Sequence, residues 1–134
     1  MTSFALRIVT PDGLEYDGMA EEVIVRTTTG DLGILAGHLD CVAPLGMGRA
    51  TVVIDGQKRY AACIGGMLSV SGGKVTLVPT TFEWSNEIDT DRVEASFQRA
   101  QEILKNGKST NTEIRLAEAR LRRALVRRSV ASEK

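Results

Sequence analysis

The sequence has 134 residues, enough for one ordinary domain with a small appendage. Its hydrophobic fraction of 43% and charged fraction of 25% are typical of a soluble globular protein. No apolar run approaches the ~20 residues that span a bilayer, and the N-terminal stretch MTSFALRIVTPDG lacks the features of a secretory signal peptide. These observations argue against a membrane-spanning helix and favour a cytoplasmic protein.

The formal net charge is zero, but the two parts of the chain differ in charge. Residues 1–87 carry ten acidic and six basic side chains, a net charge of −4, whereas residues 88–134 carry seven acidic and eleven basic ones, a net charge of +4. Six of these basic residues are arginines between Arg115 and Arg128. Such a segment suits a phosphate ligand, an acidic protein, a membrane surface or a nucleic acid. Because no aromatic residues are interleaved to stack on bases, we expect no nucleic-acid partner.

Short strands joined by tight turns are predicted from the N-terminus onward. Side chains alternate over residues 4–9 with the period of a half-buried strand, and a TPDG turn follows at residues 10–13. Residues 23–26 show the same alternation.

Two hairpins are predicted further along the chain. Asp55-Gly56 joins the segments RATVVID and KRYAACI, and Ser71-Gly72-Gly73 joins MLSV and KVTLV. Strands recurring about every ten residues, with no helical period between them, predict an all-β sandwich or barrel of about ten strands over residues 1–85.

The N-terminal part contains no combination of residues typical of catalysis. The segment GDLGILAGH, residues 30–38, is interpreted as a loop; it lacks the Gly-Lys-Ser/Thr of a P-loop, and His38 has no Ser, Cys or carboxylate orienter nearby. We expect a structural or interface role for it, and a bulge or close backbone approach at Gly65-Gly66. Cys41 and Cys63 lack CxxC spacing and a nearby His, which predicts two unpaired, buried thiols.

The C-terminal part has the pattern of an antiparallel helical hairpin over residues 86–134, so the fold class is α+β. The first helix is predicted over residues 90–105 and ends at Asn106-Gly107. Thr110 and Glu113 fit a capping box that begins a second helix over residues 111–130. The apolar stripes are Val93, Phe97, Ala100 and Leu104 in the first helix, and Ile114, Ala117, Leu121, Ala124 and Leu125 in the second.

The apolar stripes are thin, so two states of the hairpin are expected: folded on the β-domain, or opened onto another surface. Helical geometry places Arg120, Arg123 and Arg127 along one edge of the second stripe, and Arg92 and Arg99 on one face of the first helix. In a closed hairpin these sets would converge on a polyanion. The alternative is a solvated basic face with pairs one turn apart.

The segment EIDTDR, residues 87–92, lies where the strands end and the helices begin. Asp91 with Glu94 fits a capping pair, and Asp89 or Thr90 could cap the helix instead. Capping does not explain why Ile88 and Arg92 flank these acids.

The order and spacing of five segments resemble the ε subunits of bacterial F-type ATP synthases over essentially the whole chain. The segments are VTPDG (9–13), GDLGILAGH (30–38), IGGMLSV (64–70), KVTLV (74–78) and EIDTDR (87–92). Two positions depart from the family's pattern, Ala36 in place of Pro and Val93 in place of Ala. The lack of a transit peptide and the Arg-rich second helix favour the bacterial form over the mitochondrial equivalent.

The resemblance implies a non-catalytic rotor subunit of a proton-translocating complex, peripheral to the cytoplasmic face of the bacterial membrane and attached only through the complex. It implies that the β-domain binds the γ subunit and the c-ring, with Gly33 and His38 in the interface. It also implies that the hairpin extends toward the catalytic α/β subunits and impedes ATP hydrolysis, with Arg115, Arg122 and Arg128 facing acidic loops.

Some bacterial members bind ATP on the compact hairpin, and the resemblance carries this site to specific positions here. The implied ligands are Glu83, Ile88, Asp89, Arg92, Arg99, Arg123 and Arg127. ATP would be a regulatory ligand, and no metal ion is implied. Val93 would narrow the pocket relative to Ala. The alternative to a rotor subunit is a stand-alone nucleotide-sensing module, and copurifying α, β and γ subunits would favour the rotor subunit.

Overall fold

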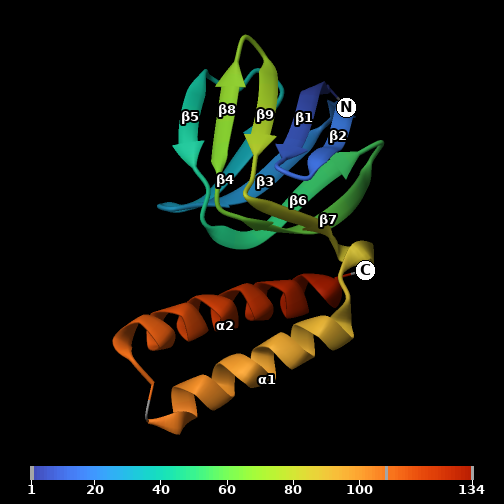
Figure 1. The fold of residues 1–134 in the computed structure, drawn as a ribbon. Helices are drawn as coiled ribbons and strands as arrows, with labels where there is room; N and C mark the ends of the chain where they lie inside the picture. The colour runs from blue at the N-terminus through green and yellow to red at the C-terminus, as the bar shows by residue number, and fades with distance from the viewer. Residues whose placement is uncertain (1, 108, 134) are drawn as a thin grey trace.

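The computed structural model describes residues 2–107 and 109–133, which form ten β-strands, one short 3-10 helix and two α-helices (Figure 1). The strands are β1 (Phe4–Thr10), β2 (Gly13–Ala20), β3 (Glu22–Thr27), β4 (Gly30–Leu35), β5 (Cys41–Pro44), β6 (Met47–Ile54), β7 (Gln57–Ile64), β8 (Met67–Ser71), β9 (Lys74–Val78) and β10 (Thr81–Trp84). The 3-10 helix η1 (Ser85–Glu87) leads to α1 (Thr90–Asn106) and α2 (Asn111–Ala131). The predicted fold class, a β-sandwich followed by a helical hairpin, is confirmed.

The strands form two five-stranded sheets that face each other. The first has the order β2-β1-β9-β8-β5 and the second the order β10-β7-β6-β3-β4. All neighbouring strands are antiparallel except β1 and β9. Side chains of Leu6, Ile8, Val23 and Leu77 are at most 1% exposed between the sheets, as the period-two alternation of these segments requires.

Both predicted hairpin turns occur where the sequence places them. Asp55-Gly56 joins β6 to β7 with positive φ at both residues, as a tight two-residue loop demands, and Gly72-Gly73 joins β8 to β9. Gly66 makes the predicted close approach, because a Cβ there would lie 2.0 Å from the Val78 carbonyl oxygen.

Two predictions about the N-terminal part were wrong. Residues 30–35 are not a loop but strand β4, which pairs with β3 and buries Ile34 completely. The apolar residues Leu32 and Ile34 alternate with their neighbours and favour this pairing. The glycines at positions 30 and 33 interrupt the pattern, so it is not evident from the sequence. Cys63 is buried as predicted, but Cys41, near the start of edge strand β5, is partly exposed.

The helices begin and end close to the predicted residues. The N-cap of α1 is Asp89, whose Oδ1 accepts a hydrogen bond from the Arg92 amide at 3.1 Å, so the Asp91–Glu94 capping pair is not formed. Gly107 ends α1 in the left-handed conformation, with φ of 71°. Thr110 caps α2 as predicted, with its hydroxyl accepting from the Glu113 amide at 3.2 Å. The Glu113 carboxylate accepts from the same hydroxyl at 3.1 Å and completes the contact between the two residues.

The hairpin is folded back on the β-sandwich, with α2 packed on β6 and β7 (Figure 1). A second apolar cluster lies at this junction and comprises Ala62, Ile88, Val93, Ala124, Val130 and Ala131. Leu125, expected in the buried stripe of α2, is 44% exposed, and the last turn supplies Val130 and Ala131 instead. The stripe shifts because the C-terminal end of α2 packs on the sheet as well as on α1.

Ion pairs also join the two helices to each other and the end of the hairpin to the β-sandwich. Arg128 on α2 donates from Nε and Nη2 to Glu94 on α1 at 2.7 and 3.0 Å, and its guanidinium lies 4.0 Å from the centroid of Phe97. Arg49 on β6 pairs with Glu133 at 3.1 Å. No helix in the described part of the chain is both long enough and apolar enough to cross a membrane.

Candidate functional site: a cavity between the sandwich and the hairpin

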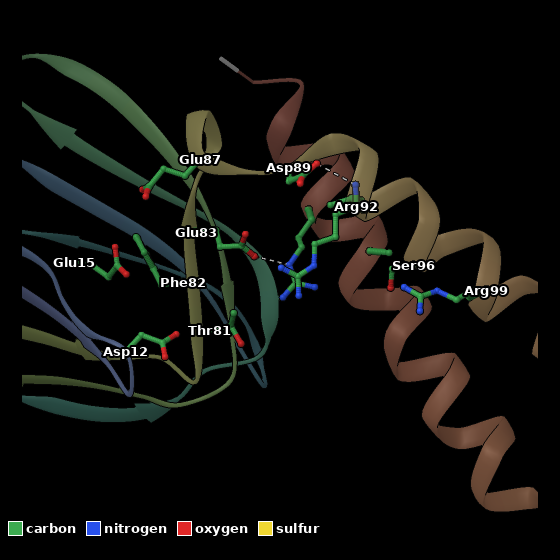
Figure 2. Close-up of a pocket in the computed structure, with 13 residues that line it drawn as sticks. Asp12, Glu15, Thr81, Phe82, Glu83, Glu87, Asp89, Arg92, Ser96 and Arg99 are labelled. Atoms are coloured by element: carbon green, nitrogen blue, oxygen red, sulfur yellow. Dashed lines mark hydrogen bonds and ion pairs between the residues drawn. The ribbon is translucent and has the colours of Figure 1, made fainter.

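A cavity of about 600 Å³ opens where the β-sandwich meets the helical hairpin. Its walls come from the β1–β2 turn, β2, β10, η1, α1 and α2, so it exists only while the hairpin is folded back (Figure 2). The lining residues are Asp12, Glu15, Thr81, Phe82, Glu83, Glu87, Asp89, Arg92, Val93, Ser96, Arg99, Ala124 and Arg127. The cavity therefore combines distant parts of the sequence.

The basic side of the cavity is built by the two helices. Arg92 and Arg99 are seven residues apart and both line it from α1, as the helical period predicts, and Arg127 lines it from α2. Ser96 lies between the two α1 arginines on the same face (Figure 2). Guanidinium groups converging on one space suit a phosphate or polyphosphate, to which each can donate charge-assisted hydrogen bonds.

Glu83 and Arg127 form an ion pair inside the cavity. Arg127 donates from Nε to Glu83 Oε1 at 2.6 Å, and the two side chains are only 24% and 33% exposed. This pair ties α2 to β10 and holds the Arg127 guanidinium against the cavity. Two of the residues assigned to ligand binding are thus partners of each other.

Asp89 and Val93 have structural roles beside their place in the cavity wall. One oxygen of the Asp89 carboxylate caps α1, and the second oxygen remains for another donor. Val93 is 7% exposed and contributes both to the cavity wall and to the second apolar cluster. The cap and the wall therefore depend on the same turn of helix.

Two of the seven residues assigned to nucleotide binding do not line the cavity. Ile88 is 8% exposed and packs within the second apolar cluster, which explains why an apolar residue precedes the helix cap. Arg123 lies one helical turn before Arg127 on α2 and is partly exposed. The other five, Glu83, Asp89, Arg92, Arg99 and Arg127, are brought together as cavity-lining residues.

Sequence reasoning missed the acidic side of the cavity. Asp12 and Glu15 come from the first hairpin, and Glu87 comes from η1 (Figure 2). The TPDG turn was identified only as a turn, and no local pattern indicates that it faces the helices more than 70 residues later. Among the described residues, no cluster of three or more His, Cys, Asp or Glu side chains is arranged to hold a metal ion.

The residues assigned to subunit interfaces are dispersed over the surface. Gly33 lies on edge strand β4, and His38 follows that strand, with its Nδ1 at 2.7 Å from the Leu39 carbonyl oxygen. Arg115 and Arg122 are exposed on α2. Arg128, in contrast, is engaged by Glu94 and Phe97 within the closed hairpin.

A β-sandwich with an arginine-rich helical hairpin folded against it defines a class of two-part subunits, and comparisons with known proteins identify the family. The model of the ATP synthase delta/epsilon chain β-sandwich domain matches residues 3–85, and that of the delta/epsilon chain long α-helix domain matches residues 86–132. The chain therefore belongs to the ATP synthase delta/epsilon chain family.

Curated relatives are similar along their full length. The ATP synthase epsilon chain of Bacillus velezensis is 44% identical over 131 residues, 98% of each chain. That of Ruminococcus albus is 42% identical over 135 residues and covers both chains completely. The recognised resemblance to bacterial ε subunits is thus confirmed.

Solved structures share the fold at low sequence identity. A chain of the Euglena gracilis mitochondrial ATP synthase (OSCP/F1/c-ring) superposes with a TM-score of 0.84 and 20% identity, covering 96% of this chain and 81% of that one. A chain of the Tetrahymena thermophila mitochondrial ATP synthase central stalk and c-ring has a TM-score of 0.61 and 13% identity, with 95% of both chains covered.

Proposed function

We propose that this chain is a non-catalytic rotor subunit of a bacterial F-type ATP synthase, whose folded-back hairpin binds ATP as a regulatory ligand. The family membership and the bacterial ε chains among the relatives support the first part. In this proposal the β-sandwich contacts the γ subunit and the c-ring, and the chain is held at the cytoplasmic face of the membrane through the complex.

The observation that carries the nucleotide proposal is the cavity at the junction of sandwich and hairpin. Its volume of about 600 Å³ lies within the range of small-molecule sites. Arg92, Arg99 and Arg127 line it from two helices, and Glu83 and Asp89 offer carboxylate oxygens nearby. The arginines are donors for the triphosphate, and the carboxylates are acceptors for the exocyclic amine of adenine.

The location of the cavity gives ATP a regulatory effect. A ligand that contacts α1, α2 and β10 at once binds the folded-back state and not the opened state. It therefore shifts the equilibrium toward the folded-back state by its differential affinity. When ATP is scarce, the hairpin opens and carries Arg115 and Arg122 to acidic surfaces of the catalytic subunits, which impedes ATP hydrolysis.

Calorimetric titration of the isolated full-length chain with ATP tests this proposal. We expect one site per chain, with affinity reduced at least about tenfold in Arg92→Ala, because a charge-assisted contact to phosphate is lost. Arg115→Ala, which removes an exposed arginine outside the cavity, is the matched control and should bind as wild type does. Equal losses in both variants would show a general charge effect and contradict the assigned site.

A further inference from the structure

The cavity has an acidic wall opposite its arginines. Asp12 and Glu15 line it from the first hairpin and Glu87 from η1, whereas Arg92 and Arg99 line it from α1 (Figure 2). A site meant only to attract a polyanion would gain nothing from three carboxylates along its edge. The carboxylates on this wall therefore affect which anions bind in the cavity and how their binding depends on pH.

Glu15 lines this wall from an irregularity in strand β2. In the pairing of β1 with β2, Ile8 is opposite Tyr16 and the next residue, Val9, is opposite Leu14. Glu15 is the extra residue of a β-bulge. A bulge changes the direction of the side chains beside it and interrupts the ordinary alternation between faces.

The surroundings of Glu15 favour its neutral form. Partial burial, followed by the nearby charges of Glu87 and Asp12, raises the pKa of Glu15 above its ordinary value. The other charged groups around the cavity come from every packed element: Glu83 on β10, Asp89 at the cap, Arg92 and Arg99 on α1, and Arg127 on α2. The basic groups lie on the helical side, while the nearest influences on Glu15 are acidic.

We propose that Asp12, Glu15 and Glu87 form a charge filter in the nucleotide cavity, which disfavours the more highly charged ligands and couples their binding to proton uptake, with Glu15 as the determining residue. This inference rests on the proposed nucleotide site. A polyphosphate held by the arginines adds negative charge across the cavity from Glu15 and makes its ionisation still less favourable. The ligand therefore binds together with a proton, and its affinity rises as the pH falls.

Glu15→Gln is the direct test, because the amide keeps the shape of the protonated acid and removes its charge. At pH 8, Glu15→Gln should bind ATP about threefold to tenfold more tightly than wild type, as expected for one carboxylate at moderate distance in a solvated site. The gain should be smaller for ADP, which carries less charge. Glu118→Gln, an exposed acid on α2 outside the cavity lining, is the control of equal charge change.

The ratio of the wild-type and Glu15→Gln dissociation constants is followed from pH 8 to pH 5.5. This ratio should fall toward one. Protonation of ATP also lowers the charge of the ligand and contributes to the fall, so the assignment to Glu15 rests on the proton uptake. Calorimetry in two buffers of different ionisation enthalpy should show greater proton uptake by wild type than by Glu15→Gln. Measurable ATP binding with equal affinities in the two proteins would overturn the charge filter alone. Failure of both proteins to bind ATP would overturn the nucleotide site, and the filter with it.

Discussion

Arg127 on α2 donates from Nε to Glu83 on β10 at 2.6 Å, and this ion pair lies in the wall of the cavity. The contact joins the helical hairpin to the β-sandwich at the place where a nucleotide is proposed to bind. A phosphate group that approaches Arg127 competes with Glu83 for the same guanidinium or uses its remaining donors. We therefore propose that Arg127 contributes both to closure of the hairpin and to ligand binding.

Arg127→Ala should weaken both functions of this contact. It leaves the partly buried Glu83 carboxylate without its cation, which should cost about 1–3 kcal/mol of hairpin docking, and it removes a donor to phosphate. Hydrogen exchange should accelerate in α2 even without ATP, and ATP affinity should fall. Arg122→Ala is the matched control on the same helix. Normal protection of α2 in Arg127→Ala would contradict the role of the ion pair.

Val93→Ala separates the shape of the cavity from the stability of the closed hairpin. Val93 lines the cavity and is 7% exposed in the second apolar cluster. Removing two methyl groups widens the cavity but loses packing, at about 1–3 kcal/mol by analogy with other buried truncations. We expect tighter ATP binding by Val93→Ala in calorimetry, with a hairpin that opens more readily in hydrogen exchange. If wild type binds ATP more tightly than Val93→Ala does, the proposed steric effect of Val93 is wrong.

The hairpin depends on the last turn of α2 for its attachment to the sheet. Val130 is completely buried, and Arg49 pairs with Glu133 at 3.1 Å beside it. Val130→Ala should therefore increase exchange of the helix amides without changing that of β1, β3 or β6, because the sandwich has a separate core. Helix amides as protected as the β-core in both proteins would contradict the expected two states.

Alanine replacements in α2 should relieve inhibition of ATP hydrolysis in a reconstituted complex. Arg115 and Arg122 are the informative positions because they are exposed in the closed hairpin. Arg128 is less suitable, since its replacement also removes the contacts to Glu94 and Phe97 and so favours opening. Relief should be smaller at high salt, where inhibition is already weaker. Unchanged hydrolysis in Arg115→Ala/Arg122→Ala would contradict the docking role.

The two cysteines should differ in reactivity. Burial raises the pKa of the Cys63 thiol to about 12, so its thiolate is scarce at pH 8, whereas Cys41 is partly exposed. A thiol reagent at pH 8 should modify Cys41 quickly and Cys63 only after denaturation. Rapid modification of both in the folded protein would contradict the burial of Cys63.

Local sequence signals predicted much of the fold. Local chemistry specifies the turns at Asp55-Gly56 and Gly72-Gly73 and the helix cap at Thr110, and all three are confirmed. Strand β4 was missed because two glycines interrupt its apolar alternation, although pairing with β3 stabilises it. This segment forms a strand because of tertiary contacts, which cannot be read from a short stretch of the sequence.

The candidate site was only partly accessible to sequence reasoning. Helical spacing placed Arg92 and Arg99 on one face, because both belong to a single helix. The acidic wall was not predicted, because its carboxylates come from the first hairpin and from η1, and only the tertiary fold brings these into one cavity with the helices. Ile88 belongs to the apolar cluster between the hairpin and the sandwich. This cluster forms only when α2 is packed on β7, so the local sequence does not predict it.

The most direct test of the central claim is a crystal structure of the full-length chain with ATP at saturating concentration. We predict a closed hairpin, with nucleotide density in the cavity and its phosphates within hydrogen-bond distance of Arg92, Arg99 or Arg127. Nucleotide bound elsewhere on the chain, or an empty cavity in a closed hairpin at saturating ATP, would contradict it.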